Sequence, residues 1–526
     1  MIYKHSSVAG ERSILIFWIN ENKGSVTNMT NGKDTGYTLP GRAESYWLAT
    51  TPESNYPFLS GDISVDVAII GGGIVGITSA FLLKQAGVSV AVIEADRIIK
   101  GTTGYTTAKI TSQHNLIYDR LISQVGRGPA KQYAESNQEA IDRIEYIVRS
   151  WNISCDFEHK PAYVYAGSED SAQKILDEVR AARSLGLPAT FESSLPLPFD
   201  TYGAVRFNRQ AQFHPRKYLC ALARELEGDS CYIFEKTRAL GIEGGEPVVI
   251  KTDRGTVRAG DAIQATNYPI FDKPGELFKR LTQSMSYVLG VRIEETFPDG
   301  MFINAEEPIR SLRSQPAEGG ELVLAVGEGH PTGHGNPTHE HYRQLEDWAK
   351  SIYNVRSIDY RWLTEDVISE DGVPLIGRLT PDSGHSYLAT GFRKWGMTTG
   401  TAAAIILTDT ILGRDNPWTE VYEPSRSRQG SEFVVREDLP EVEPDQGSLI
   451  EKGEDKVAVY RDPQGALYTL NPACRHMGCP VSWNDADKTW DCHCHGSRYN
   501  ARGEVIQSPA VYGLLEKKVK EQDRQR

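Results

Sequence analysis

The sequence lacks any long apolar run, and this absence removes one class of protein from consideration. A membrane-spanning helix needs about 18 or more consecutive apolar residues, and no stretch of the 526 residues approaches that length. An excess of positive charge is also missing, because 57 Lys and Arg residues stand against 70 Asp and Glu residues, a formal net charge of −13. This balance argues against a nucleic-acid partner.

Cysteine is scarce and unevenly placed. The chain has seven cysteines, and four of them lie between positions 474 and 494. The other three, Cys155, Cys220 and Cys231, are isolated, and we expect them to be thiols. Because the evenly paired cysteine framework of a small secreted protein is missing, the cytoplasm is the expected compartment.

The clustered cysteines form two short Cys/His boxes, Cys474-Arg475-His476-Met477-Gly478-Cys479 and Cys492-His493-Cys494-His495-Gly496-Ser497. They read C-x-H and C-x-x-H, the ligand set of a Rieske [2Fe-2S] centre, in which two thiolates hold one iron and two imidazoles the other. Zinc is the competing interpretation, because Cys and His at short spacing also form tetrahedral zinc sites. A zinc site needs four ligands, however, whereas these two boxes offer at least six candidates.

The two boxes resemble those of respiratory-type Rieske proteins. The resemblance implies two thiolate and two imidazole ligands to the cluster: Cys474, Cys492, His476 and His495. It implies a disulfide between the two remaining cysteines, Cys479 and Cys494. It also implies that Ser497 and Tyr499 donate hydrogen bonds to sulfur, which stabilise the reduced cluster and raise its potential. His493 stands where the family often has Pro, and we expect it to face solvent.

A glycine-rich turn near the other end predicts a dinucleotide site. A β-branched run over residues 65–70 predicts a buried strand and leads directly into the G-x-G-x-x-G sequence of residues 71–76. An apolar helix pattern follows and ends near Gly87, and a second strand over residues 90–93 ends at Glu94. In this context the glycines let the backbone approach a pyrophosphate at a helix N-terminus, and the acidic residue binds ribose hydroxyls and disfavours NADP. The expected cofactor-binding residues are Gly71, Gly73, Ile74, Val75, Gly76 and Glu94.

The fingerprint alone does not separate FAD from NAD, but three other segments do. They are the Thr-rich residues 101–109, the run Tyr387-Leu388-Ala389-Thr390-Gly391-Phe392, and the turn Gly396-Met397-Thr398-Thr399-Gly400. In this order they resemble the D-amino-acid oxidase superfamily, which includes glycine and sarcosine oxidases, over residues 60–415. The resemblance implies further FAD-binding residues: Thr102, Thr103, Thr107, Gly391, Gly396, Met397 and Thr398.

Together the resemblances imply an α/β, Rossmann-like FAD-binding domain with an inserted α+β substrate domain, followed by a small all-β Rieske domain. We expect a disordered N-terminal extension at residues 1–40, the flavoprotein at 41–420, a linker at 421–443 and the Rieske domain at 444–526. Within the extension, Met29 begins a more typical polar leader, and we expect it to be the natural start.

The expected activity is that of an FAD-dependent oxidoreductase. It would oxidise a C–N bond of a small amine or amino acid by hydride transfer to flavin and relay single electrons through the cluster to an unknown acceptor. Lys394 is a candidate catalytic residue, because its charge would stabilise the reduced flavin. Arg313, with Arg310, is a candidate for binding a substrate carboxylate, with structural ion pairs as the alternative. His330 and His334 are expected to be incidental residues of a flexible Gly-rich loop.

Two other function classes remain open. An NADH-dependent reductase that feeds an oxygenase through the cluster would carry a second G-x-G-x-x-G, and residues 327–329 lack the downstream glycine and helix that this requires. A redox carrier whose flavin never turns over is not excluded by any residue.

Overall fold

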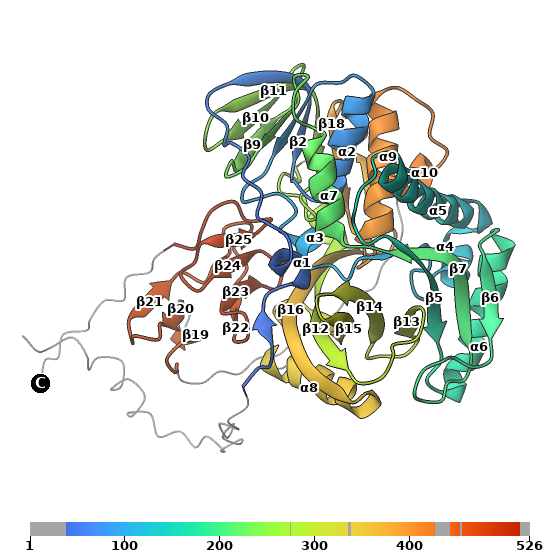
Figure 1. Ribbon diagram of the computed structural model, residues 1–526. Helices are drawn as coiled ribbons and strands as arrows, with labels where there is room; N and C mark the ends of the chain where they lie inside the picture. Colours follow the sequence, from blue (N-terminus) through green and yellow to red (C-terminus); the bar gives the residue numbers. More distant parts are fainter. Residues whose placement is uncertain (1–37, 274, 335–337, 427–441, 453–454, 516–526) are drawn as a thin grey trace, which may run out of the picture. The chain divides into compact units, whose positions relative to one another are not determined.

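The computed structural model describes residues 38–426 and 442–515, apart from 274, 335–337 and 453–454 (Figure 1). The expected disordered extension, including Met29, falls almost entirely outside these described residues, as does most of the expected linker. The described residues from Pro40 onward form one compact unit.

The glycine-rich turn lies at the end of a central strand of a mainly parallel sheet. Its strands follow the order β17-β18-β11-β2-β3-β8. Strands β18, β11, β2, β3 and β8 are parallel to one another, and β17 is antiparallel to β18. Strand β10 pairs antiparallel with β11, and β9 pairs antiparallel with β10. The bounds are β2 (Ile63–Ile70), β3 (Val90–Ile93), β8 (Tyr232–Phe234), β9 (Ala239–Glu243), β10 (Val248–Thr252), β11 (Thr256–Gln264), β17 (Leu375–Arg378) and β18 (Ser386–Thr390). This is the expected Rossmann-like sheet, and the turn after β2 lies at its carboxyl edge, where such sheets bind ligands.

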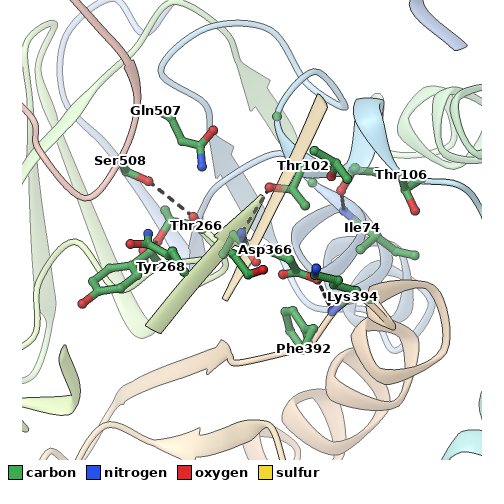
Figure 2. Close-up of a pocket in the computed structure, with 18 of the residues that line it drawn as sticks. Ile74, Thr102, Thr106, Thr266, Tyr268, Asp366, Phe392, Lys394, Gln507 and Ser508 are labelled. Carbon is green, nitrogen blue, oxygen red and sulfur yellow. Dashed lines mark hydrogen bonds between the residues drawn. The ribbon is translucent and has the colours of Figure 1, made fainter. Parts of the chain in front are cut away.

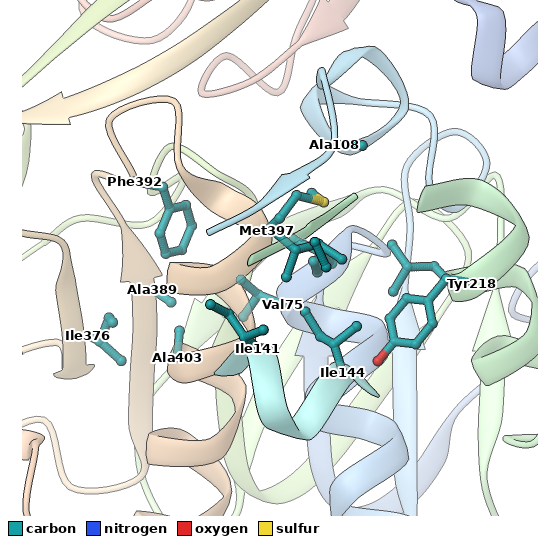
Figure 3. Close-up of a cluster of buried hydrophobic side chains, with 14 of the residues drawn as sticks. Val75, Ala108, Ile141, Ile144, Tyr218, Ile376, Ala389, Phe392, Met397 and Ala403 are labelled. Carbon is teal, nitrogen blue, oxygen red and sulfur yellow. The ribbon is translucent and has the colours of Figure 1, made fainter. Parts of the chain in front are cut away.

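Two apolar helices beside this sheet hold the turn in place. Helix α2 (Ile74–Gln85) begins in the glycine-rich sequence, and α9 (Gly396–Ile411) packs against it (Figure 1). The approach is close because a Cβ on Gly400 would lie only 3.0 Å from Cγ2 of Ile74. Figure 3 shows Val75 and Met397, one from each helix, among the buried side chains of the main core.

The structure also describes several other helices. They are α1 (Tyr46–Ala49), α3 (Thr102–Tyr105), α4 (Tyr118–Val125), α5 (Arg127–Ser150), α6 (Glu169–Ser184), α7 (Pro215–Arg224), α8 (Thr338–Ile352), α10 (Thr419–Tyr422) and the 3-10 helix η2 (Leu277–Arg280). Helix α5 packs on α9, and α7 packs on α2. None of the described helices is long and apolar enough to cross a membrane.

A second, larger sheet forms the expected inserted α+β domain. Its order is β1-β16-β12-β15-β14-β13-β5-β7-β4, with β6 paired to β7, and α8 covers β12 and β15. Its bounds are β1 (Arg42–Ala43), β4 (Lys109–Ile110), β5 (Glu158–Tyr165), β6 (Ala189–Glu192), β7 (Ala204–Gln212), β12 (Leu281–Ile293), β13 (Met301–Asn304), β14 (Ser311–Ala317), β15 (Gly320–Pro331) and β16 (Val355–Ser369). Its strands come from distant parts of the chain, so residues that are far apart in sequence share one wall.

The C-terminal part is all β, as expected. It has one antiparallel sheet of β19 (Gln446–Lys452), β20 (Asp455–Arg461) and β21 (Leu467–Leu470), and a second of β22 (Val481–Asn484), β23 (Thr489–Cys492), β24 (Arg498–Asn500) and β25 (Val505–Gln507). Trp490, Tyr499 and both Cys474 and Cys492 are buried in its core.

The packed flavoprotein extends past the expected boundary at residue 420. Tyr422 is fully buried and its hydroxyl lies 2.7 Å from Oγ of Ser136. Arg426 forms a buried ion pair with Asp371 at 2.9 Å. The first six residues of the expected linker, 421–426, therefore pack as part of the flavoprotein.

Candidate active site

A cavity of about 1260 Å³ is lined by the dinucleotide sheet, the second sheet and the Rieske domain. Gly71 and Glu94 line one end, Ser286 of β12 lines the second-sheet wall, and Gln507 and Ser508 reach it from the Rieske side. Figure 2 shows residues from all three regions around the same space. Its size suits an extended cofactor together with a small substrate.

The dinucleotide end is built mainly from backbone. Gly71 has a φ of 109°, a left-handed conformation that favours glycine. The N–H of Gly72 donates to Oε2 of Glu94 at 2.8 Å, and the N–H of Ile74 donates to Oγ1 of Thr103 at 3.1 Å. A Cβ on Gly76 would overlap with the carbonyl oxygen of Gly71, so helix and turn meet without side chains between them. This cradle fits a dinucleotide pyrophosphate at the start of α2.

Most residues expected to bind FAD line the cavity: Gly71, Gly73, Ile74, Val75, Glu94, Thr102, Thr103, Thr107, Gly396 and Met397. Gly76, Gly391 and Thr398 are not among the residues that line it, and their part in FAD binding stays a prediction. Gly391 has a φ of 78° and packs against Ser369, and the buried Thr398 donates to the carbonyl of Thr111 at 2.9 Å. Gly391 and Thr398 therefore lie behind the residues that line the cavity.

Two of the lysines that line the cavity, Lys394 and Lys109, come from different elements. Lys394 itself has a left-handed backbone conformation, with a φ of 68°, and its Nζ donates to Oγ of Ser286 at 2.7 Å. Its backbone N–H donates to Oδ2 of Asp366 at 2.5 Å. The side chain is accessible from the cavity but enclosed by protein, and this enclosure lowers the pKa of its ammonium to about 8.

Lys109 of β4 is the second lysine, and its position was not foreseen from the sequence. It is 8% exposed, and its Nζ donates to Oγ of Ser311 at 3.0 Å and to Oγ1 of Thr107 at 3.3 Å. Burial, with a contribution from the nearby Arg313, lowers the pKa of its ammonium to about 7. Within the described part of the chain, no carboxylate forms an ion pair with it.

Arg313 does not line the cavity, which corrects its expected role in substrate binding. It is fully buried, and its Nη1 donates to the carbonyls of Thr107 and Ala108, each at 3.0 Å. Its Nη2 donates to Oε1 of Gln315 and its Nε to the carbonyl of Ser314. The guanidinium thus holds the backbone just before Lys109.

Arg310 takes the structural alternative, because it forms an ion pair with Glu328 at 2.6 Å. His330 also differs from expectation: it belongs to strand β15, and its Nε2 lies 2.8 Å from Oη of Tyr287. His493 was expected to face solvent, but it is half-buried and its ring lies 5.4 Å from that of His334.

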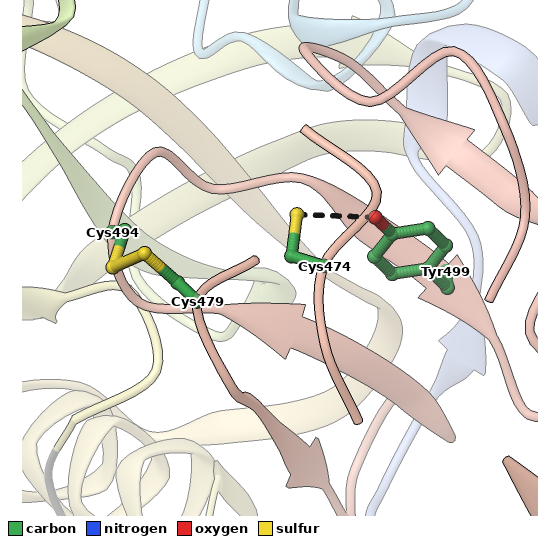
Figure 4. Close-up of a disulfide and its surroundings, with 4 residues drawn as sticks. All are labelled: Cys474, Cys479, Cys494 and Tyr499. Atoms are coloured by element: carbon green, nitrogen blue, oxygen red, sulfur yellow. Dashed lines mark hydrogen bonds between the residues drawn. A yellow bond between two sulfur atoms is a disulfide. The ribbon is translucent and has the colours of Figure 1, made fainter. Parts of the chain in front are cut away.

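The two Cys/His boxes come together in the C-terminal domain. The thiols of Cys474 and Cys492 interact with each other, and this interaction is the main reason that the pKa of Cys474 is lowered. Oη of Tyr499 lies 3.1 Å from Sγ of Cys474 (Figure 4). Cys479 and Cys494 form the disulfide that the resemblance implied.

The imidazoles of His476 and His495 lie next to each other. Their ring centroids are 4.9 Å apart and their planes are perpendicular, at 89°. Both Nδ1 atoms are buried and have no hydrogen-bond partner among the described residues. An unpartnered buried polar atom is costly, so these nitrogens fit ligation of a group that the chain itself does not supply.

The donor set divides into two pairs, as a Rieske centre requires. Among the described residues, no three Cys, His, Asp or Glu side chains are grouped around a single metal ion. A pair of thiols stands beside a pair of unpartnered imidazoles instead. This arrangement fits a [2Fe-2S] cluster with different ligands on its two irons.

The Rieske domain contacts the flavoprotein beside the cavity. Nε2 of Gln507 donates to the carboxylate of Glu365, and Oγ of Ser508 donates to the carbonyl of Thr266 at 3.4 Å. Glu365 is 2% exposed, and burial raises its pKa to about 8. No sequence signal marked this acid, because its burial depends on the contact between the two domains.

Comparison with known proteins agrees with both halves of the site. The family described as DAO, FAD dependent oxidoreductase, matches residues 66–410, and the Rieske [2Fe-2S] domain family matches residues 433–517. YhfW of Bacillus subtilis (strain 168), named as a Rieske 2Fe-2S iron-sulfur protein, is 36% identical over 492 residues, covering 90% of this chain and 97% of its own.

Two further similarities concern the flavoprotein part. Gamma-glutamylputrescine oxidoreductase of Escherichia coli (strain K12) is 23% identical over 384 residues, covering 70% of this chain and 89% of its own. The crystal structure of glycine oxidase from Geobacillus kaustophilus aligns with a TM-score of 0.59 at 16% identity, over 70% of this chain and 100% of that chain. At this identity the structural likeness shows the fold alone.

Proposed function

Because the chain belongs to the family of DAO-type FAD-dependent oxidoreductases and carries a C-terminal Rieske domain, we propose that it oxidises a C–N bond of an amine or amino acid. When bound, FAD supplies a two-electron hydride acceptor, and the [2Fe-2S] cluster supplies a one-electron acceptor for a relay to a separate carrier. The similarity to an oxidoreductase named for an amine and the glycine-oxidase-like fold support this donor class.

The proposed cluster ligands are Cys474, His476, Cys492 and His495, as in the resemblance to Rieske proteins. The two interacting thiols and the two unpartnered imidazole nitrogens support this assignment. The proposed dinucleotide contacts are the backbone of residues 71–75 and the carboxylate of Glu94, which together line one end of the cavity.

The observation that carries the substrate class is the buried ammonium of Lys109. A buried charge without a partner is strongly disfavoured, and the usual response is a shift of the pKa toward neutrality. The lowered pKa of Lys109 shows that response. A substrate carboxylate in the cavity would provide the missing counter-charge, so we favour an amino acid over a simple amine.

Lys394 has a different proposed role. Its backbone precedes α9, and its Nζ is held at the second-sheet wall by Ser286. We retain the proposal that its positive charge stabilises the reduced flavin. A cation in an enclosed site interacts more strongly with developing negative charge than one in water.

An anaerobic titration of the purified holoprotein tests the function. Glycine, L-proline, sarcosine and putrescine are added in turn, then NADH, and the visible absorption of flavin and cluster is recorded. Bleaching of the flavin by an amino acid, followed by loss of the Rieske bands, is the expected result. Bleaching by NADH alone would replace the proposal with the reductase function, and inertness to every compound would replace it with the carrier function.

A further inference from the structure

Tyr268 lies between the FAD-binding cavity and the cluster ligands. It belongs to the segment Ala265–Tyr268 that follows β11, and all four residues of that segment line the cavity. Its ring is buried, with 2% exposed. Figure 2 shows its hydroxyl directed away from Lys394, and this hydroxyl has no hydrogen-bond partner among the described residues.

The ring of Tyr268 contacts both imidazoles of the Cys/His boxes. Its centroid lies 6.2 Å from that of His476 and 5.8 Å from that of His495, with steep interplanar angles of 80° and 63°. Phe278 of η2 also packs on His495, at 5.2 Å, but it does not line the cavity. Tyr268 therefore has contacts on both sides, whereas Phe278 has a contact on the cluster side only.

The imidazole side of the Rieske domain is tightly covered by the flavoprotein. His495 is 9% exposed. A Cβ on Gly496, which has a φ of 65°, would overlap with the side chain of Gln283 on β12. The close approach at this glycine leaves little room for water between His495 and the flavoprotein. The contact is thus packed protein rather than a solvent-filled gap.

From this geometry we propose that Tyr268 is a positioning residue for electron transfer. Its ring forms the packed contact through which electrons pass from the flavin site to the imidazole side of the cluster. Electron tunnelling weakens steeply with distance and is weaker across water or empty space than through packed atoms. The ring packs on both imidazoles, and Tyr268 also lines the cavity.

This inference rests on the proposed relay, and its electron count is simple. Each transfer takes one electron from reduced flavin and reduces the oxidised cluster by one. Two transfers return the anionic reduced flavin that hydride transfer produces to its oxidised form and release one proton, provided that a one-electron acceptor reoxidises the cluster between them. Ferricyanide serves as that acceptor in the test.

The test uses holoprotein whose flavin is photoreduced, so that no substrate is needed. The variants are Tyr268→Ala, Tyr268→Phe and the matched control Phe278→Ala. Electron arrival at the cluster is followed by its absorption and by its electron paramagnetic resonance signal, and reoxidation by ferricyanide is measured separately. FAD content, cluster content and the cluster's resting spectrum show whether each variant is correctly assembled.

We expect Tyr268→Ala to slow flavin-to-cluster transfer by at least about tenfold, because small displacements at a reacting contact have large effects on rate. Tyr268→Phe keeps the ring and should transfer within about threefold of the wild-type rate, as should Phe278→Ala, both well inside the tenfold that corresponds to about 1.4 kcal/mol.

Equal slowing in Tyr268→Ala and Phe278→Ala would overturn the inference in favour of general domain docking. Slowing in Tyr268→Phe as large as in Tyr268→Ala would also overturn it, by placing the role in the hydroxyl. Absence of any transfer in the wild-type protein would instead refute the proposed relay itself, so the two failures are distinguishable.

Discussion

The two walls of the cavity differ in what they are made of. The dinucleotide wall is formed by backbone from one contiguous segment, residues 71–75, and Gly76 behind it allows a close contact that excludes side chains. The opposite wall is formed by side chains on strands far apart in sequence, such as Lys109 on β4 and Ser286 on β12. The dinucleotide wall therefore tolerates little change in side-chain volume. On the opposite wall, one substitution can change the charge without loss of packing.

The largest effect is expected from a substitution directly behind the dinucleotide wall. Gly76→Ala places a methyl group against the carbonyl of Gly71. Overpacking of this kind costs about 1–3 kcal/mol of folding stability, and here it also displaces the turn that holds the cofactor. We expect purified protein that lacks FAD and melts at a lower temperature, measured by absorption and calorimetry.

Gly128→Ala is the matched control, because no atom lies within 4 Å of a Cβ at that position, which is in the first turn of α5 and does not line the cavity. It should keep its FAD. Full FAD content in Gly76→Ala would show that the wall is more deformable than the geometry indicates.

The second expectation concerns the charge of Lys109 on the wall opposite the dinucleotide wall. A hydrogen bond to a charged group contributes about 1.5–3 kcal/mol, so Lys109→Met should weaken binding of a simple carboxylate roughly 10- to 100-fold. Benzoate lacks an amine and would be titrated into the holoprotein while the flavin difference spectrum is recorded. Lys236→Met is the control, because Lys236 also lines the cavity but pairs with Asp96. An equal loss in both variants would refute a specific contact with Lys109.

The third expectation is the pH dependence of the same binding. Lys109 in the free protein has a pKa lowered to about 7 by burial. A bound carboxylate favours the protonated form, so its pKa in the complex is higher. Benzoate affinity should therefore be constant below about pH 7 and fall by up to about tenfold per pH unit above it. Lys109→Met should bind weakly and without this slope; a slope that persists in the variant would assign the titration to another group.

The smallest expected effect is at the cluster. Tyr499→Phe removes the hydroxyl that lies 3.1 Å from Sγ of Cys474. A hydrogen bond of about 1 kcal/mol corresponds to roughly 40 mV for one electron, so the midpoint potential should fall by about that amount. Redox titration measures it, and Tyr460→Phe, whose hydroxyl bonds Asp445 at 2.9 Å, should leave the potential unchanged. A rise in potential on removing the Tyr499 hydroxyl would contradict the account.

The difference between a wall built from one contiguous segment and a wall built from distant strands also explains what could be predicted from the sequence. The residues of the glycine turn and of the Cys/His boxes are contiguous, and their spacing reflects local backbone geometry, so the fold class and the positions of both sites were predictable. Lys109 was not, because its burial depends on the approach of β14, which brings Ser311 to it. Arg313 was assigned wrongly because its sequence does not reveal that its donors are used by the carbonyls before Lys109. The contact of Tyr268 with the imidazoles was equally hidden, since it depends on how two domains pack.

Rapid mixing of the oxidised holoprotein with the amino acid identified by titration tests the central claim most directly. Flavin absorption and the resonance signal of the reduced cluster are followed anaerobically in wild type and in Cys492→Ser. The account predicts that the cluster signal rises in step with reoxidation of the flavin in the wild type, and that Cys492→Ser still bleaches its flavin but shows no cluster signal. A flavin that is reduced while an intact cluster stays oxidised would contradict it.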